Sequence, residues 1–253
     1  MRISIITLTF NSKKTILKTI NSIKGQTYKN IEKIWIDNQS TDGTYEILKE
    51  NKDQDTVLIS EKDKGICDAF NKGYKLYSGD IVGFLHSDDQ FVHNDVIKNI
   101  VNIFEKKEIN FIYSNLNYIK KNNKVFRKWL GGQVNFNYEK NTFYEKKLKY
   151  GWMPPHPTTY IKSDFQKKIG LFNEDYSISF DYDYLIRCFK NKNIKSYFLN
   201  QFTVNMYLGG NSNKSLKNIL KKMIEDYKII KINKLNGLIT LIFKNLTKIK
   251  QFF

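Results

Sequence analysis

The sequence predicts an α/β fold in which a mostly parallel β-sheet is flanked by helices. The first observation is that short apolar runs alternate with segments of helical spacing over residues 3–85, as in consecutive βαβ units. The second is that the run at 81–85 is almost wholly apolar, which is typical of a strand buried on both faces. The third is that each run ends in polar or acidic residues. With 253 residues, 41% of them hydrophobic, the chain can bury a sizeable core.

The first part of the chain supplies four strands with helices between them. A β-rich run is followed by the N-cap signal Asn11-Ser12 and by apolar residues at helical spacing that stop at Gly25. A turn at 40–44 begins the second helix, and the turn Lys64-Gly65 precedes the third, at 66–77. The predicted strands of this part are 3–9, 31–36, 56–59 and 81–85.

After residue 89 the alternation weakens. We expect helices at 96–104, from 164 to Gly170, and at 215–233, and a strand at 111–113. Residues 118–120 and 125–129 flank a hairpin signal at 121–123, while 136–150 is aromatic, basic and hard to assign. All three prolines lie within 153–158, so this stretch is predicted to be a stiff extended loop.

Polar side chains follow the four predicted strands of the first part. Thr9, Asp37 and Asp63 follow the first three, and Asp88 and Asp89 follow the fourth. Because the carboxyl ends of parallel strands meet at one edge of a sheet, these residues together predict a nucleotide-binding crevice, although each alone suits a cap or a turn. Two adjacent carboxylates form a hard oxygen site, suited to a divalent ion that also holds phosphate.

The charge is unevenly distributed along the chain. Residues 1–100 hold 14 Lys or Arg and 14 Asp or Glu, so the whole formal charge of +17 lies after them. A basic second part suggests an anionic partner: lipid headgroups, nucleic acid or an anionic acceptor. No apolar run approaches the ~20 residues of a membrane span. With no signal peptide after Met1-Arg2 and two distant cysteines, we expect a cytoplasmic protein with reduced thiols.

Four motifs, in order, carry a resemblance to a known family. They are Ser4–Asn11, Ile36–Thr44, Asp63–Gly73 and His86–Asp89. This pattern resembles the nucleotide-sugar half of the family 2 glycosyltransferases, and the match extends over about the first 205 residues. The resemblance implies a GT-A fold, Rossmann-like, and inverting transfer from a nucleotide sugar. Asn38 stands where the family usually has a second aspartate, and Leu8 where it usually has a proline.

The resemblance also implies site residues. Ser87-Asp88-Asp89 matches the aspartate-x-aspartate-type metal motif, so Asp88 and Asp89 are the expected ligands of Mn²⁺ or Mg²⁺. Donor-binding residues are expected in the four motifs: Thr9, Phe10, Asn11, Asp37, Asp63, Lys64, Gly65, Asp68, Asn71, His86, Ser87 and Asp88. Asp68 and Asn71 stand three apart on one helical face, where a surface role is an equal alternative.

Three residues are candidates for catalysis on the acceptor side. Asp181 opens a helical segment, where the macrodipole favours a carboxylate; it is either a simple N-cap or, by the resemblance, the general base. Asp183 is the second choice, and it either orients Asp181 or pairs with Arg187 at i+4. His156, in the proline-rich loop, is a site residue by resemblance to a surface-polysaccharide (colanic-acid-type) subgroup, or an exposed structural histidine.

We therefore expect a catalytic domain over 1–208, with a nucleotide-sugar half (1–100) and an acceptor half (101–208), followed by a basic amphipathic helical extension over 209–253. The extension suits either an anionic membrane surface or packing on the domain. The expected activity is hexosyl transfer from a UDP-linked sugar to a hydroxyl of a glycan or lipid-linked acceptor in bacterial surface polysaccharide synthesis, at the inner face of the membrane.

Two rival functions are weaker. A nucleic-acid-binding module is suggested by charge alone, but the carboxylates cluster where a phosphate backbone would be repelled, so we expect no nucleic-acid partner. A nucleotidyltransferase would need a glycine-rich motif after the first strand, where this chain has Thr9-Phe10-Asn11-Ser12. No P-loop motif and no Gly-x-Gly-x-x-Gly occurs, so ATPase and dehydrogenase functions of those types also lose support.

Overall fold

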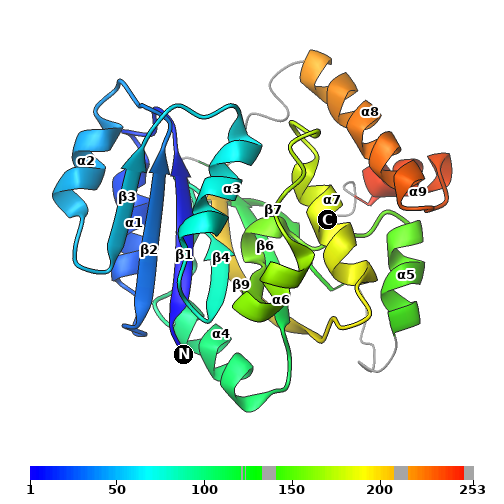
Figure 1. Cartoon of the computed structure of the whole chain (residues 1–253), viewed down its shortest axis with the longest axis horizontal. Coiled ribbons are helices and arrows are strands. Elements are labelled where there is room, and N and C mark those ends of the chain that lie inside the picture. Colours follow the sequence, from blue (N-terminus) through cyan, green and yellow to red (C-terminus); the bar gives the residue numbers. More distant parts are fainter. Residues whose placement is uncertain (121, 123, 133–140, 208–215, 248–253) are drawn as a thin grey trace.

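The computed structural model describes the chain except for residues 121, 123, 133–140, 208–215 and 248–253. Its first four strands lie side by side in the order β3-β2-β1-β4 and are all parallel. They are β1 (Ile3–Thr9), β2 (Ile31–Asp37), β3 (Thr56–Ser60) and β4 (Ile81–Phe84). The N-terminus lies at the lower end of β1 in Figure 1, so the carboxyl ends of these strands form the upper edge of the sheet.

Beyond β4 the same sheet continues in the order β8-β6-β9-β5, and β7 pairs with β6. β8 is antiparallel to both β4 and β6, so β6 and its parallel neighbour β9 run in the same direction as β1. The prediction of a mostly parallel sheet is therefore confirmed. These strands are β5 (Gln90–Phe91), β6 (Phe111–Ile119), β7 (Val125–Trp129), β8 (Tyr160–Lys162) and β9 (Ser196–Tyr207).

Helices cover both faces of the sheet (Figure 1). On one face α1 (Ile16–Lys24), α2 (Thr44–Asn51) and α4 (Val96–Lys106) bury their apolar sides. On the other face lie α3 (Ile66–Leu76), α6 (Ser163–Ile169) and α7 (Phe180–Lys190). Two glycines allow close approach: a Cβ on Gly73 of α3 would lie 2.5 Å from the Ile6 side chain, and one on Gly83 of β4 would lie 2.5 Å from the Tyr160 ring.

Three parts of the second half differ from expectation. The run at 111–113 and the residues at 118–119 belong to one strand, β6, whose hairpin with β7 is as predicted. The proline-rich stretch is not extended throughout, because Pro155 is extended but His156–Thr158 forms a 3₁₀ turn, η1, with Pro157 in its first turn. Of the stretch at 136–150, Asn141–Lys149 forms α5, and 136–140 lies outside the described residues.

The C-terminal part forms α8 (Leu216–Ile232) and α9 (Leu238–Leu246), which pack against each other, with α8 against α7 and α9 against α5. Ile229, Ile230 and Leu241 join the same core as α3 and α7. The inner side of α8 and α9 therefore packs on the catalytic domain, which was one of the two alternatives for the extension. Gly209-Gly210 and residues 248–253, which the prediction included in the extension, lie outside the described residues. Among the described helices none is both long and apolar enough to cross a bilayer.

Candidate active site

Asp37 ties together the carboxyl ends of three strands. Its buried carboxylate accepts hydrogen bonds from the Thr9 Oγ1 (2.9 Å), the Ser60 Oγ (2.7 Å) and both the backbone N–H (3.0 Å) and Oγ (2.5 Å) of Ser40. Its oxygens are therefore already occupied by donors from β1, β3 and the loop after β2. Thr9 and Asp37 were both expected to bind the donor. Their mutual hydrogen bond holds β1 and β2 together at this edge of the sheet.

The loop after β1 reaches both neighbouring loops. Asn11, at φ +48°, accepts the Thr41 N–H at its Oδ1 (3.0 Å) and donates its own N–H to the Ser40 Oγ (2.9 Å). The Ser12 and Ser87 hydroxyls lie 2.9 Å apart, which joins this loop to the carboxylate motif. Phe10, directly before Asn11, is 59% exposed. An exposed aromatic ring at a strand end is a suitable surface for a nucleotide base.

The third motif is organised by Lys72 on α3. Its Nζ lies 2.7 Å from Asp63, 3.0 Å from Glu61 and 3.2 Å from Asp68, so it offsets their negative charge. Burial raises the pKa of Asp63, and Lys72 opposes that shift. The Lys64 backbone N–H donates to Asp68 (3.0 Å), while the Lys64 side chain and Gly65 are exposed at the rim.

Two amides of the donor motifs have structural partners. The Asn38 Oδ1 accepts the Asp63 N–H (2.7 Å), which links the loops after β2 and β3, so an amide serves this position in place of a carboxylate. Buried Asn71 binds the backbone of Phe172 in both directions, donating to its oxygen (3.1 Å) and accepting its N–H (2.9 Å), and also donates to Glu174 (3.0 Å). Asn71 therefore joins α3 to the segment before α7.

Asp89 differs from every other carboxylate at this edge. Its backbone is fixed, because its N–H donates to the His86 oxygen (2.9 Å) and its own oxygen accepts from Thr19 (2.9 Å). Its side chain is fully buried, yet neither carboxylate oxygen has a hydrogen-bond partner among the described residues. Burial and the charge of Asp88 raise the pKa of Asp89 well above its usual value, and the backbone N–H of Tyr207, which lies near the carboxylate without the geometry of a hydrogen bond, opposes this. A buried carboxylate without a donor is incomplete unless a cation or proton joins it.

The residues present fit a divalent cation that is shared with a diphosphate. Asp89 offers two uncommitted oxygens, and half-buried Asp88 lies next to it. No three His, Cys, Asp or Glu side chains gather into a metal cage anywhere in the described ranges. Mg²⁺ and Mn²⁺ are commonly held by one or two carboxylates, with the remaining oxygens from phosphate and water. This donor set suits such an ion.

Aromatic rings form the layer beneath the carboxylate motif. The Phe70 ring lies 5.6 Å from His86, 5.5 Å from His156 and 5.0 Å from Phe180, centroid to centroid. Burial, together with the nearby His86, lowers the pKa of His156 to about 3. His156 is therefore buried rather than exposed, and neutral at physiological pH. Phe180 directly precedes Asp181, so this layer connects the end of β4 with the start of α7.

The two acidic residues of α7 lie in different surroundings. Asp183 is bound by the Arg187 Nε (2.9 Å), and Arg187 also donates to the backbone oxygens of Ile169 and Leu171, which makes this pair a structural contact. The Asp181 carboxylate is half-buried, and the N–H that it accepts is that of its neighbour Tyr182. Burial raises the pKa of Asp181, whereas Lys244 and Lys222 act against the rise. Of the two, Asp181 is therefore the candidate for a general base.

Tyr118 on β6 connects the two ends of the site and was not among the predicted residues. Burial raises its pKa, and the charges of both Asp89 and Asp181 raise it further, so the phenol lies within electrostatic reach of both carboxylates. Arg127 on β7 lies over the Tyr118 ring, 3.8 Å from its centroid, and opposes the shift. Only a hairpin signal marks this stretch in the sequence, because the pairing of β6 with β9 that brings Tyr118 to this edge is not local.

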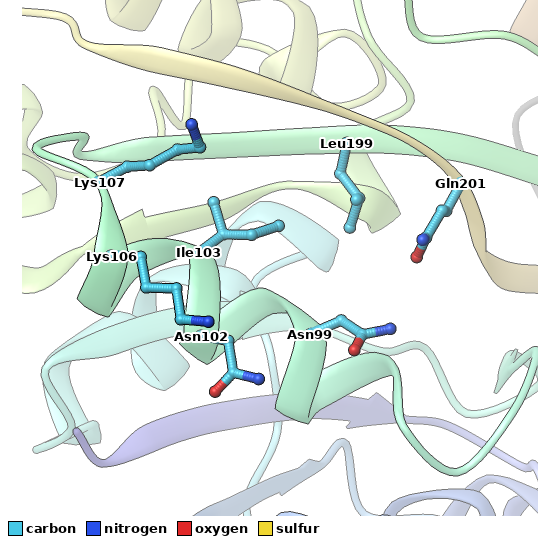
Figure 2. Close-up of a pocket in the computed structure, with 7 residues that line it drawn as sticks. All are labelled: Asn99, Asn102, Ile103, Lys106, Lys107, Leu199 and Gln201. Atoms are coloured by element: carbon cyan, nitrogen blue, oxygen red, sulfur yellow. The ribbon is translucent and has the colours of Figure 1, made fainter.

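A pocket between α4 and β9 is separate from these residues. It is lined by Asn99, Asn102, Ile103, Lys106, Lys107, Leu199 and Gln201, with a volume of about 280 Å³ (Figure 2). In the close-up, Leu199 and Gln201 of β9 face the side chains of α4. None of its residues belongs to the strand-end motifs or to α7, so it is not the candidate active site.

The fold and the motifs define a family. The profile of Glycosyl transferase family 2 matches residues 4–167, and the chain belongs to that family. This interval includes all the strand-end motifs but ends before α7. The architecture, with its mostly parallel curled sheet, is the GT-A fold that the resemblance implied.

The chain is similar to one relative in sequence and to two solved structures in fold. WfaP of Escherichia coli, a UDP-Glc:alpha-D-GlcNAc-diphosphoundecaprenol beta-1,3-glucosyltransferase, is 40% identical over 120 residues, which span 47% of this chain and 47% of WfaP. Staphylococcus aureus TarS 1–349, in complex with UDP-GlcNAc, superposes with a TM-score of 0.69 at 17% identity, over 92% of this chain and 65% of TarS 1–349. The mannosyltransferase PcManGT of Pyrobaculum calidifontis, in complex with GDP-Man and Mn²⁺, has a TM-score of 0.64 at 14% identity, over 97% and 73%.

Proposed function

We propose that this chain is an inverting glycosyltransferase that moves a hexose from a UDP-sugar to a hydroxyl of a lipid-linked glycan in surface polysaccharide synthesis. Family membership supports the reaction class. The UDP-sugars named for WfaP and TarS support a UDP-linked donor, and the diphosphoundecaprenol acceptor named for WfaP supports a lipid-linked one. The observation that carries the proposal is the fully buried Asp89 carboxylate without a hydrogen-bond partner in the described part of the chain.

Asp89, with Asp88 beside it, would hold Mn²⁺ or Mg²⁺ together with the donor diphosphate. When bound, such an ion neutralises the charge that develops on the departing diphosphate. The chain itself orients the donor. Phe10 offers its exposed ring to the base, and the loops joined by Asn11, Ser12 and Ser87 border the diphosphate position. Lys64, at the rim, is a further cation for the nucleotide.

Asp181 would act as the general base. It accepts the proton of the acceptor hydroxyl as that oxygen forms a bond to the anomeric carbon. The bond from that carbon to the diphosphate oxygen breaks on the opposite face, and its electron pair leaves with UDP. One displacement of this kind inverts the anomeric configuration. The raised pKa of Asp181, caused by burial, brings the carboxylate closer to the range in which it accepts a proton effectively.

The outer side of α8 and α9 would place the enzyme at a membrane. Exposed apolar side chains lie on both helices, and exposed lysines accompany them: Leu220, Ile224, Leu238, Ile239 and Ile242 with Lys217, Lys221, Lys228, Lys231 and Lys234. The acidic residues of these helices, Glu225 and Asp226, are both buried. The exposed ionic side chains of these helices are therefore all cations, which suits anionic lipid headgroups at the inner face of the cell membrane.

The test is the release of UDP from UDP-Glc and from UDP-GlcNAc, with and without Mn²⁺. We expect Mn²⁺-dependent release by the wild type, and loss of release in both Asp89→Asn and Asp181→Asn. Asp175→Asn, a change at an exposed aspartate near α7, is the matched control and should retain wild-type release. Release that needs no metal and survives Asp89→Asn would contradict the proposed site.

A further inference from the structure

Both acidic residues of the C-terminal helices point inward, toward α7. Glu225 is 6% exposed and Asp226 is 1% exposed. Acidic residues of a basic, surface-lying helix pair would ordinarily face solvent. Their burial against α7, the helix that carries Asp181, indicates a specific role there.

Glu225 holds the segment that leads into α7. Its Oε1 accepts the N–H (3.1 Å) and the Oγ (2.9 Å) of Ser177, and its Oε2 accepts the N–H groups of Ile178 (2.9 Å) and Ser179 (2.9 Å). The N-cap residue of α7, Ser179, makes no side-chain capping bond of its own. A carboxylate from α8 thus binds the N–H groups of the segment that leads into α7, up to that of its N-cap residue, at the positive end of the α7 dipole. Burial works to raise the pKa of Glu225, but these hydrogen bonds hold it below its usual value.

Asp226 and Lys244 form a buried ion pair next to the same helix end. The Lys244 Nζ lies 2.6 Å from Asp226, and the two side chains are 4% and 2% exposed. The same Nζ lies 3.3 Å from the centroid of the Tyr182 ring, a cation–π contact with the residue that follows Asp181. Lys222 lies 3.6 Å from Asp226 on its other side. Burial lowers the pKa of Lys244 to about 7, so below that pH it carries a positive charge close to Asp181.

We propose that Glu225 and Lys244 are positioning residues for the general base: Glu225 fixes the segment that leads into α7, and Lys244 places a cation next to Asp181. This inference rests on the proposed role of Asp181. It makes the C-terminal helices part of the catalytic unit rather than only an attachment to a surface.

The charges around Asp181 are consistent with this role. Burial and the charge of Asp226 raise the pKa of Asp181. Lys244 and Lys222 lower it, and the effect of Lys244 is the larger of the two. Tyr118 on β6 lies within electrostatic reach of Asp181. A base must be a carboxylate to accept a proton, so removing Lys244 should move the acid limb of the rate profile to higher pH.

The first test separates positioning from simple docking of the helices. In Glu225→Gln the amide nitrogen cannot accept hydrogen bonds, so the bonds to one of the two oxygens are lost. We expect kcat for UDP release from UDP-Glc to fall about 10- to 100-fold, the cost of a small misplacement of a catalytic group, with KM for UDP-Glc within about twofold. Thr240→Val is the matched control, because it removes a buried hydrogen bond from α9 to the Lys149 oxygen (2.6 Å) on α5, not α7.

Thr240→Val should lower the melting temperature while kcat stays at the wild-type value. Equal losses of kcat in the two variants, in proportion to their losses of stability, would overturn the inference. A wild-type kcat in folded Glu225→Gln would do the same.

The second test uses the pH profile of kcat. Lys244→Met should shift the acid limb to higher pH, because the cation that lowers the pKa of Asp181 is gone. Lys190→Met is the control: it removes the same charge from the far end of α7, where the Nζ donates to the Asn233 oxygen (2.8 Å), and should leave the limb unchanged. An unshifted limb in folded Lys244→Met contradicts the inference.

Asp181→Asn distinguishes this inference from the function on which it rests. If Asp181→Asn retains wild-type release, the assignment of the base is wrong whatever Glu225 does. If Asp181→Asn loses release while Glu225→Gln and Lys244→Met keep wild-type kcat and pH dependence, only the positioning role fails.

Discussion

The Asp89 side chain is kept in an environment that does not favour a negative charge. It is fully buried and lacks a hydrogen-bond donor among the described residues, whereas Asp37 at the same edge receives hydrogen bonds from Thr9, Ser40 and Ser60. Uncompensated buried charges are costly and persist at sites where function requires them. The two aspartates therefore differ in role. Asp37 holds neighbouring strands together at this edge, whereas we propose that Asp89 binds a cation.

This difference predicts opposite effects of Asp89→Asn on stability and on activity. Without metal, the neutral amide should stabilise the fold, because it is less costly to bury than an unpaired carboxylate. A gain of about 1 kcal/mol corresponds to a melting temperature about 2–4 °C higher for a chain of this size. Thermal unfolding in a chelator checks the gain and UDP release checks the loss. A destabilised variant would mean that Asp89 has a partner.

Asp183→Asn should show the reverse pattern. Asp183 binds Arg187, which also ties α7 to the backbone oxygens of Ile169 and Leu171. Loss of a charged hydrogen bond costs about 1.5–3 kcal/mol, so the free energy of unfolding should fall by that order while kcat stays within a few fold. Chemical denaturation and UDP release measure the two. A loss of kcat as large as that of Asp181→Asn would return Asp183 to the catalytic group.

Among residues, the sequence could locate the acidic positions but not rank them. Asp37, Asp63 and Asp89 all follow predicted strands, and their order in the sequence is alike. What separates them is which partners reach them: Lys72 for Asp63, hydroxyls of neighbouring strands for Asp37, and no described side chain for Asp89. These contacts are tertiary, so spacing along the chain does not reveal them.

At the scale of elements, η1 delivers a histidine to an aromatic layer rather than to solvent. With the pKa of His156 lowered to about 3, its imidazole is a poor proton acceptor at neutral pH. His156→Gln should therefore keep the acid limb of the kcat profile at its wild-type position, even if packing with Phe70 and Phe84 is weakened. A pH–rate series compares the two proteins. Disappearance of the limb in His156→Gln would make His156 the base.

Elements of the first half were predictable because local pattern and tertiary role agree there. β1 to β4 are apolar runs with helices of regular spacing, and Gly25 and Gly43 mark helix ends. β9 was missed, because Asn200, Gln201 and Asn205 interrupt its apolar pattern, and its register with β6 shifts at Ser114 and Asn115. Buried polar pairs hold it instead, including Ser114 with Thr203. Such pairs join residues far apart in the sequence, so the local sequence pattern does not predict them.

At the scale of the whole molecule, the exposed side of α8 and α9 should bind anionic vesicles. Leu238→Asp with Ile242→Asp places charges on the apolar face of α9, and binding to vesicles containing phosphatidylglycerol should fall several-fold. Binding by the wild type should also weaken as salt rises, because the lysines act through screened charge. Leu17→Asp, at an exposed leucine of α1, is the control and should bind normally. Cosedimentation measures all three, and equal binding by the double variant would contradict a membrane role for this face.

The molecule as a whole brings two carboxylates from distant parts of the sequence within electrostatic reach of one phenol. Asp89 follows β4, Asp181 lies in the first turn of α7, which packs against α8, and Tyr118 lies within electrostatic reach of both. The sheet order β4-β8-β6 is what brings β6 beside the first four strands. The activity proposed above depends on Asp89 holding the donor through a cation.

Calorimetric titration of UDP, with and without Mn²⁺, into the wild type and Asp89→Asn tests that dependence most directly, because no acceptor is needed. We predict that Mn²⁺ tightens UDP binding by the wild type at least tenfold and has no effect on Asp89→Asn, which should remain folded. Equal Mn²⁺-dependent affinity in both proteins would contradict the assignment of Asp89 as the residue that holds the metal and, with it, the donor diphosphate.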